Sequence, residues 1–454
     1  MTTLAFVLGV LFMATGVALS IALHEVGHLV PAKRFGVRVT QYMVGFGPTM
    51  WSRRRGETEY GVKALPLGGY IRMIGMFPPR PGQDPGTVRV SSTGRFSQLV
   101  DEARAASLEE VRPGDEDRVF YKLSVPRKVV VMLGGPVMNL LIGVFLLTIL
   151  VTVHGVATPQ PGAVVTSVSQ CVVPVTEVGD ATTCTDQPKT PALLAGMQPG
   201  DQILSIAGQP VDDTRDVGAI IRPRVGQPVD LVVERDGERL TLTATPIRNV
   251  VPVLADDGTP VTNPDGTTRT TEAGFLGVRS TAPVDYVAQP VTAVPGIVWG
   301  FVSQTAQALV HIPERMVGVW NAAFSGAERE VDSPMSVVGV GRVAGEASGG
   351  KYDSFVGESV GDKLWFLVGL LAALNFMLFV FNLIPLLPLD GGHVAGALWE
   401  GLKRTVARLR GRPDPGYVDV AKALPLAYTV SMVLLGASLL LIYADLVKPI
   451  NLGG

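Results

Sequence analysis

Cysteine is nearly absent from this sequence, since only Cys171 and Cys184 occur among its 454 residues. Two cysteines exclude a disulfide framework and a thiolate zinc site. They are compatible with one local disulfide and, equally, with two free thiols. Charged residues are also scarce, at 17%, and the net charge is −2. This balance offers no electrostatic basis for binding nucleic acid, so we expect no nucleic-acid partner.

Apolar residues are abundant instead, because they make up 47% of the chain and the mean hydropathy is +0.33. They gather in four stretches, each of which reaches the roughly 20 residues that cross a bilayer. We expect transmembrane helices at 1–30, 129–154, 363–390 and 423–446. The first stretch is not a cleaved signal peptide, because no basic segment precedes it and its end carries chemically functional residues.

Lysine and arginine residues near the span ends predict the orientation of the chain. They concentrate in 31–128 and 391–422, which we therefore place in the cytoplasm, whereas 154–362 and both termini lie outside. The uncharged stretch 286–312 contains prolines and polar residues, so we expect an amphipathic helix at the outer interface. A fifth span there would reverse the third span and separate its end from the end of the first span by most of the bilayer.

The first predicted span ends in His24-Glu25-Val26-Gly27-His28, which is an H-E-x-x-H pattern. Residues four apart share a helix face, so both imidazoles can hold one zinc ion while Glu25 acts as general base on metal-bound water. Two packing histidines at a helix end are the alternative, but they leave a buried glutamate without a partner. An ionisable cluster within a span is by default a functional site.

A catalytic zinc usually takes three protein ligands and keeps one position for water. Asp390 is the candidate third ligand, because it ends the third predicted span at the same cytoplasmic depth as the two histidines. Pro385 and Pro388 precede it and interrupt the helix, which provides the irregular backbone that such an approach needs. Two alternatives stay open: Asp390 caps the span, or His393 is the ligand in its place.

Three asparagines lie inside the second and third predicted spans, namely Asn139, Asn375 and Asn382. Their amides can hydrogen-bond a substrate backbone or a developing oxyanion. Hydrogen bonds between helices are the alternative role.

Residues 37–73 predict a β-hairpin, because β-prone residues flank the turn-like Arg53-Arg54-Arg55-Gly56. A hairpin edge near the metal would pair with a substrate strand and hold it extended. A solvated cytoplasmic hairpin is the alternative.

Residues 157–248 resemble a PDZ domain in the bacterial strand order, and two alternating strands surround the turn at Asp236-Gly237. Pro161, Gly162 and Ala163 form the candidate loop for a peptide carboxylate. Such a domain would admit substrates already shortened outside, whereas a folded plug without a ligand is the alternative. Residues 249–362 are expected to form an extracytoplasmic linker and interfacial helices.

Together these motifs resemble those of the site-2 protease family of membrane metalloproteases. The patterns H-E-x-x-H at 24–28 and N-x-x-P-x-x-P-L-D-G-G at 382–392 are the hallmarks of that family. The segment 135–139, Gly-Pro-Val-Met-Asn, resembles its G-P-x-x-N element, and segments 45–48 and 66–71 resemble those that flank its membrane-associated β-hairpin. The resemblance covers nearly the whole chain, although enterobacterial members carry two PDZ domains where this chain has one.

The resemblance implies a polytopic α-helical membrane protein with four transmembrane helices, a membrane-associated β-hairpin and one inserted extracytoplasmic PDZ domain of α+β type. It implies an intramembrane zinc metalloendopeptidase in the bacterial cell membrane, with Zn²⁺ as cofactor and the active site towards the cytoplasm. The implied substrates are single-span proteins in the lipid bilayer, such as anti-sigma factors trimmed by a site-1 protease, and signal-peptide remnants. Gly68, Gly69, Gly135 and Pro136 join the three asparagines as implied substrate-binding residues.

Two other functions fit parts of the sequence. A catalytically silent adaptor with a PDZ domain has no use for a base beside a metal, so an intact Glu25 disfavours it. A metal transporter needs polar residues along a path, whereas these spans offer one clustered site.

Overall fold

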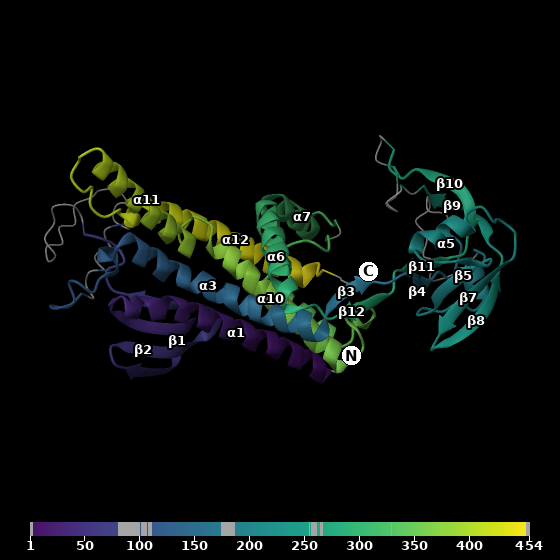
Figure 1. The fold of residues 1–454 in the computed structure, drawn as a ribbon, viewed down its shortest axis with the longest axis horizontal. Coiled ribbons are helices and arrows are strands. Elements are labelled where there is room, and N and C mark those ends of the chain that lie inside the picture. The colour runs from purple at the N-terminus through teal and green to yellow at the C-terminus, as the bar shows by residue number, and fades with distance from the viewer. Residues whose placement is uncertain are drawn as a thin grey trace. The chain divides into compact units, whose positions relative to one another are not determined.

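The computed structural model describes residues 3–79, 100, 107, 111–173, 187–253, 255, 261–263, 267–327 and 329–450. The chain divides into two compact units, shown in Figure 1. The helical unit comprises 1–154 and 289–454, and the sheet unit comprises 155–288. In sequence, therefore, the sheet unit is inserted between the second and third long helices.

Four long apolar helices form the frame of the helical unit and run along a common direction in Figure 1. They are α1 (Thr3–Arg34), α3 (Val125–Ile149), α10 (Val360–Asn382) and α12 (Leu424–Val447), and a π-helical turn at Leu150–His154 continues α3. Among the described residues, these are the four helices long and apolar enough to cross a membrane. This number agrees with the four spans expected from the sequence.

Helices α1 and α3 approach each other through glycines. A Cβ atom on Gly27 of α1 would lie 3.0 Å from the Cα of Gly135 and closer still to the carbonyl of Gly134. Small residues permit such backbone contact between membrane helices. The backbone of α3 consequently lies directly against the turns of α1 that carry His24 and His28.

The third long helix is shorter than the expected span 363–390, because α10 ends at Asn382. Residues 383–389 form turns, in which Pro385 and Pro388 lack the N–H groups that a continuing helix would need. A new helix, α11 (Asp390–Leu409), begins at Asp390. The expected cytoplasmic segment 391–422 is therefore largely helical, and the short helix η4 (Val420–Ala423) leads from it into α12.

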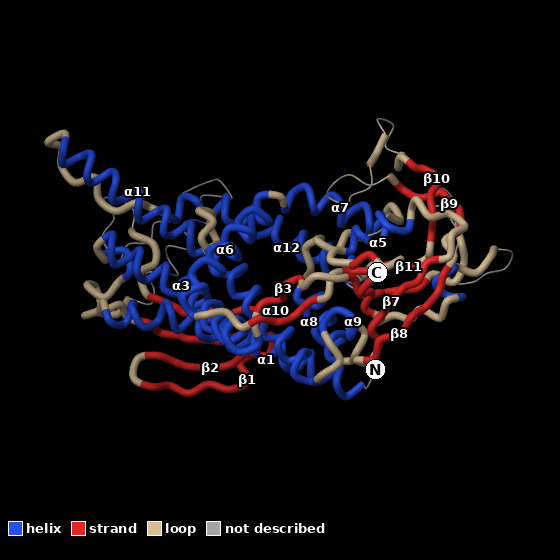
Figure 2. Tube along the Cα trace, turned by 45° about the vertical axis from the view of Figure 1, so that its right-hand side comes forward, coloured by secondary structure: helices blue, strands red, loops and turns tan. Residues whose placement is uncertain are grey.

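The expected hairpin consists of β1 (Val39–Arg55) and β2 (Thr58–Met73), and Figure 2 shows it in red beside α1. The hairpin is folded over on itself, since Val44 pairs with both Val62 and Gly69. The bends fall at Gly45 and Gly68, whose φ angles of +96° and +138° favour glycine. Residues 41–44 near the start of β1 thus lie between the two halves of β2, and residues 69–73 form an outer strand.

The stretch 286–312, expected as one interfacial helix, contains the end of a strand, a short 3-10 helix, one long helix and the first residue of the next helix. Its first residues belong to β12 (Val284–Val287), and the helical part is α6 (Val294–Val310), which packs against α10 through stacked Phe301 and Phe376. The remaining helices of this unit are η1 (Phe120–Lys122), η3 (Val291–Ala293), α7 (Ile312–Phe324), α8 (Val337–Ser348) and α9 (Asp353–Val356). Helix α8 packs against α1, where Gly9 leaves no room for a Cβ beside Ser348.

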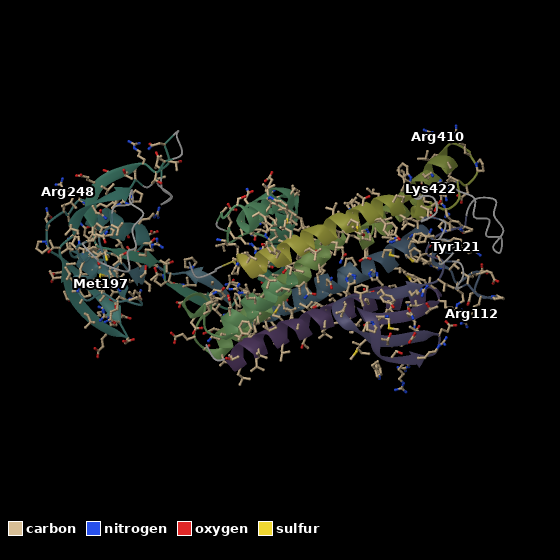
Figure 3. All side chains as sticks on the ribbon, turned by 180° about the vertical axis from the view of Figure 1, so that it is seen from behind. Arg112, Tyr121, Met197, Arg248, Arg410 and Lys422 are labelled. Carbon is tan, nitrogen blue, oxygen red and sulfur yellow. The ribbon has the colours of Figure 1, made fainter. Side chains whose placement is uncertain are left out.

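The sheet unit is built on a sheet with the strand order β11-β4-β5-β7-β8 and with β6 paired to β5. Its elements are β3 (Val156–Pro159), β4 (Ala163–Val168), α4 (Pro191–Leu194), β5 (Gln202–Ile206), β6 (Gln209–Pro210), α5 (Thr214–Ile221), β7 (Val229–Arg235), β8 (Glu238–Ala244), β9 (Ile247–Pro252), β10 (Thr270–Phe275), β11 (Val278–Thr281) and β12. The core gathers Ile203, Leu231 and Val217 from two strands and α5, together with Met197, which is labelled in Figure 3.

The expected domain boundary at 248 is too early. Strand β11 pairs with β4, β10 pairs with β9, and β12 pairs with β3, so residues 249–288 complete the sheet unit. The Gly-, Pro- and Asp-rich composition predicted a linker because its turns dominate the pattern, whereas the intervening strands are short. Cys171 is disulfide-bonded, which decides between the two alternatives for the cysteines, and Cys184 lies outside the described residues.

Candidate metal centre

His24 and His28 lie one turn apart on α1, and their Nε2 atoms are 3.2 Å apart. Asp390, the first residue of α11, brings its Oδ2 atom to 3.3 Å from Nε2 of His24 and 3.4 Å from Nε2 of His28. Across the described ranges, this is the one group of three or more potential ligands close enough to hold a metal ion. The structure therefore brings the three residues selected from the sequence to one point.

The start of α11 is fitted tightly against the turns that precede it. A Cβ atom on Gly392 would lie 2.5 Å from the backbone nitrogen of Leu387, and one on Gly391 would meet the carbonyl group of Leu383. The two glycines after Asp390 therefore let the new helix begin directly under the connection from α10. His393, the alternative ligand, is not part of the three-residue group.

Glu25 is 8% exposed and lies between the histidines and the hairpin. A Cβ atom on Gly69 would lie 2.9 Å from Cγ of Glu25, and the backbone of Ile71 also faces the glutamate. The hydroxyl of Tyr42 donates a hydrogen bond of 2.8 Å to the carbonyl of Ala22, which ties the hairpin to α1. The outer strand of the hairpin thus borders the side of the site that carries the candidate base.

The second expected span contributes a supporting face to the site. Nδ1 of His28 lies 2.8 Å from the carbonyl oxygen of Val131, and Nδ1 of His24 lies 3.1 Å from Nδ2 of Asn139. Gly135 lies between them, where a Cβ would be 2.6 Å from Nε2 of His24. The contribution of Val131 cannot be predicted from the sequence, because it is made by a backbone carbonyl group and every residue has one.

The other expected substrate-binding residues are placed in different surroundings. Asn375 is 0% exposed and donates one hydrogen bond to Oγ of Ser20 on α1, which is the interhelical alternative, and another to the carbonyl of Leu371 on its own helix. Asn382 is the last residue of α10 and is half-buried. Pro136 is buried in α3 beside Gly135, and Gly68 and Gly69 lie in β2.

The expected carboxylate-binding loop of the sheet unit has few donors to offer. Pro161 has no N–H group, and the N–H of Gly162 donates a hydrogen bond of 2.8 Å to the carbonyl of Asp212. Ala163 begins β4 and is fully buried. The expectation that 161–163 presents free N–H groups to a carboxylate is therefore wrong for Pro161 and Gly162.

The set of donors fits zinc, which favours two imidazole nitrogens and one carboxylate oxygen with a fourth position for water. The carbonyl of Val131 fixes Nε2 of His28 as the nitrogen with the free lone pair, and that atom faces the other two donors. Such a set, partly buried and next to a glutamate, matches the geometry of a catalytic metal centre.

Comparison with known proteins agrees with this geometry. The model of Peptidase family M50 matches residues 12–421. The chain is 34% identical to Zinc metalloprotease Rip1 of Mycobacterium tuberculosis over 98% of this chain and 99% of that protein. It is 27% identical to Metalloprotease MmpA of Caulobacter vibrioides, over 86% of this chain and 85% of that protein.

The chain belongs to peptidase family M50. It is a zinc metalloprotease and a multi-pass membrane protein that acts on membrane proteins in the bilayer. The resemblance to site-2 proteases seen in the sequence is confirmed.

Proposed function

We propose that His24, His28 and Asp390 are the three protein ligands of the catalytic zinc. The observation that supports this proposal is the convergence of their three donor atoms, all within 4.8 Å of one another. The bound ion supplies Lewis-acid activation of the scissile carbonyl and of the attacking water. The remaining catalytic work falls to side chains of the chain itself.

Glu25 is the proposed general base. It follows His24 directly on α1, so its carboxylate is held next to the ligands, where it takes a proton from the attacking water and delivers it to the leaving amine. Burial beside two imidazoles keeps bulk water away from this transfer. Asn382, at the end of α10, is the proposed donor towards the developing oxyanion.

The proposed substrates are single-span membrane proteins, with anti-sigma factors already trimmed by a site-1 protease as the leading class. A helical substrate hides its carbonyls in hydrogen bonds and must be unwound before attack. The outer strand 69–73 of the hairpin borders Glu25, so strand addition there would hold the unwound segment extended beside the zinc.

The metal centre is proposed to face the cytoplasm. Arg112, Arg410 and Lys422 lie at one end of the helical unit in Figure 3. Basic residues are enriched on the cytoplasmic side of membrane proteins, which supports a cytoplasmic location for this end. The sheet unit is proposed to be extracytoplasmic, as the sequence predicts.

Proteolysis is tested with the purified full-length protein and a panel of single-span substrates. Wild type should cleave a substrate within or near its span, and Glu25→Ala should lower the rate roughly 10²–10⁴-fold, which is the usual contribution of a general base. Glu314→Ala is the matched control, since Glu314 is exposed on α7. Cleavage at equal rates by wild type and Glu25→Ala, or by neither across the panel, would contradict the proposal.

The sheet unit is proposed to be a PDZ-type domain that selects trimmed substrates. Its strand β4 is already paired on both sides, with β5 and with β11, so a peptide can add to this strand only after β11 leaves. Replacing Ser280 by proline in β11 should weaken that pairing and admit untrimmed substrates. Unchanged selectivity in Ser280→Pro, with the β4–β11 contact shown to be lost by hydrogen exchange, would contradict the filter.

A further inference from the structure

Three residues of α3 face the two histidines at regular spacing. Val131, Gly135 and Asn139 are four residues apart, so they occupy one face of α3. Gly135 carries no side chain, which allows both imidazole rings to lie against this face. The residues one turn before and one turn after it each reach the Nδ1 atom of one histidine.

The direction of the hydrogen bond made by His28 follows from the chemistry of its partner. A carbonyl oxygen only accepts hydrogen bonds, so Nδ1 of His28 carries the hydrogen and donates it to Val131 at 2.8 Å. Nε2 then has the free lone pair and faces Asp390. Metal-binding histidines regularly donate their second N–H in this way, which fixes the ring and its tautomer.

His24 needs an equivalent acceptor. Its Nε2 atom faces the metal position, so in the neutral ring its Nδ1 atom carries the hydrogen, and the amide of Asn139 lies 3.1 Å from that atom. Asn139 is 1% exposed, and its Oδ1 atom has no hydrogen-bond partner among the described residues. An amide turned by 180° exchanges Oδ1 and Nδ2 and places the acceptor on Nδ1 of His24.

We propose that Asn139 is a positioning residue for the zinc ligand His24, with Oδ1 accepting the hydrogen of Nδ1. This inference rests on the proposed ligand assignment and changes the role expected for Asn139 from substrate binding to support of the metal. Helix α3 then orients both histidines, through a backbone carbonyl at Val131 and a side-chain amide at Asn139. The rotation moves the unpartnered position from the amide oxygen to the amide nitrogen.

Zinc affinity of the purified full-length protein tests the proposal without relying on activity. Asn139→Leu removes the acceptor at similar volume and should weaken zinc binding 10–100-fold, the usual effect of losing such a partner. Asn139→Asp keeps an oxygen acceptor and should bind zinc at least as tightly as Asn139. With Co²⁺ in place of zinc, Asn139→Leu should also shift the visible absorption bands, whereas Asn139→Asp should retain bands of similar intensity.

Asn375→Leu is the matched control, because it removes a buried amide from a neighbouring helix without touching a histidine. It should bind zinc as wild type does. Wild-type affinity in Asn139→Leu, or equal losses in Asn139→Leu and Asn139→Asp, would overturn the positioning role alone. Full zinc binding by His24→Ala would overturn the ligand assignment and this inference with it.

Discussion

The two units of the chain contain buried polar groups whose hydrogen-bond partners differ. In the sheet unit, Asp201 is fully buried and accepts hydrogen bonds of 2.6 and 2.8 Å from Arg235 and one of 2.9 Å from the backbone of Gln198. In the helical unit, His24, His28 and Asp390 turn their donor atoms towards one another. The first arrangement is complete without a ligand, whereas the second is the site proposed to hold the zinc ion.

This difference concerns the metal centre and not the whole helical unit, because the helical unit also contains a fully compensated buried charge. Glu400 of α11 is 2% exposed and accepts hydrogen bonds from Lys128 of α3 at 2.8 and 3.0 Å and from the backbone of Val418 at 3.1 Å. This ion pair joins the helix that carries Asp390 to the helix that supports the histidines. A buried charge therefore indicates a functional site only where protein partners leave it incomplete.

Removing the metal should produce the largest difference in response between the two units. A zinc chelator should abolish cleavage and increase hydrogen exchange around 20–30, because the converging donors lose the cation between them. Hydrogen exchange in 155–288 should stay unchanged, since the partner of Asp201 is Arg235. Added zinc should restore cleavage, and equal loss of protection in both units would contradict the separation.

A core truncation in the sheet unit provides the reverse test. Ile203→Ala should destabilise that unit by about 2–5 kcal/mol, because Ile203 is fully buried in its core. Zinc content should be unchanged. Hydrogen exchange of peptides from 155–288 measures the effect, and Leu194→Ala, at an exposed leucine, is the control. Loss of zinc in Ile203→Ala would show that the units are coupled.

Gly135→Ala should affect only the metal centre. The added Cβ meets both histidines, and such overpacking costs about 1–3 kcal/mol, so zinc affinity should fall roughly 5–150-fold. Gly318→Ala on α7 is the control, because a Cβ there meets no atom within 4 Å. Wild-type zinc affinity in Gly135→Ala would mean that the rings do not rest on α3.

Acid should weaken the sheet unit gradually. Burial raises the pKa of the Asp201 carboxyl, but hydrogen bonds from Arg235 and Gln198 and the charge of Arg235 outweigh it and hold the pKa below its ordinary value. The stabilisation is therefore complete above about pH 4, the pKa of an unfolded aspartate, and is lost as the pH falls through the folded pKa. Hydrogen-exchange protection of β5 and β7 should decline in this range, and Asp201→Asn should remove that dependence.

The sequence predicted the parts of the site that depend on periodicity and depth. The spacing of His24 and His28 places them on one helix face, and the position of Asp390 at the end of an apolar stretch places it at the same level. The four spans followed from hydropathy. The third span was predicted to continue to residue 390, whereas α10 ends at Asn382. Hydropathy does not distinguish the apolar turns of 383–389 from a helix.

Other features depend on contacts between distant segments, which leave no local pattern. The hairpin folds on itself because Val44 pairs on both of its sides. A simple hairpin would show the same alternation of apolar and polar residues, so the sequence does not distinguish the two. The pairing of β11 with β4 joins segments more than 100 residues apart and escaped notice for the same reason. The sequence left the amide of Asn139 with two alternatives, substrate binding and an interhelical hydrogen bond, and its contact with His24 becomes apparent only when α3 lies against α1.

The division of the metal centre between α1 and α11 also has a consequence in time. His28 and Asp390 are separated by 362 residues of chain. At about 5–20 residues per second, ribosomes need roughly 20 to 70 seconds to synthesise that interval. During synthesis the growing chain holds two histidines and a glutamate in its first helix but lacks the carboxylate that completes the set. With the proposed ligand set, the site can bind its metal ion only after synthesis has passed Asp390, which is the first residue of α11 and lies in the second half of the chain.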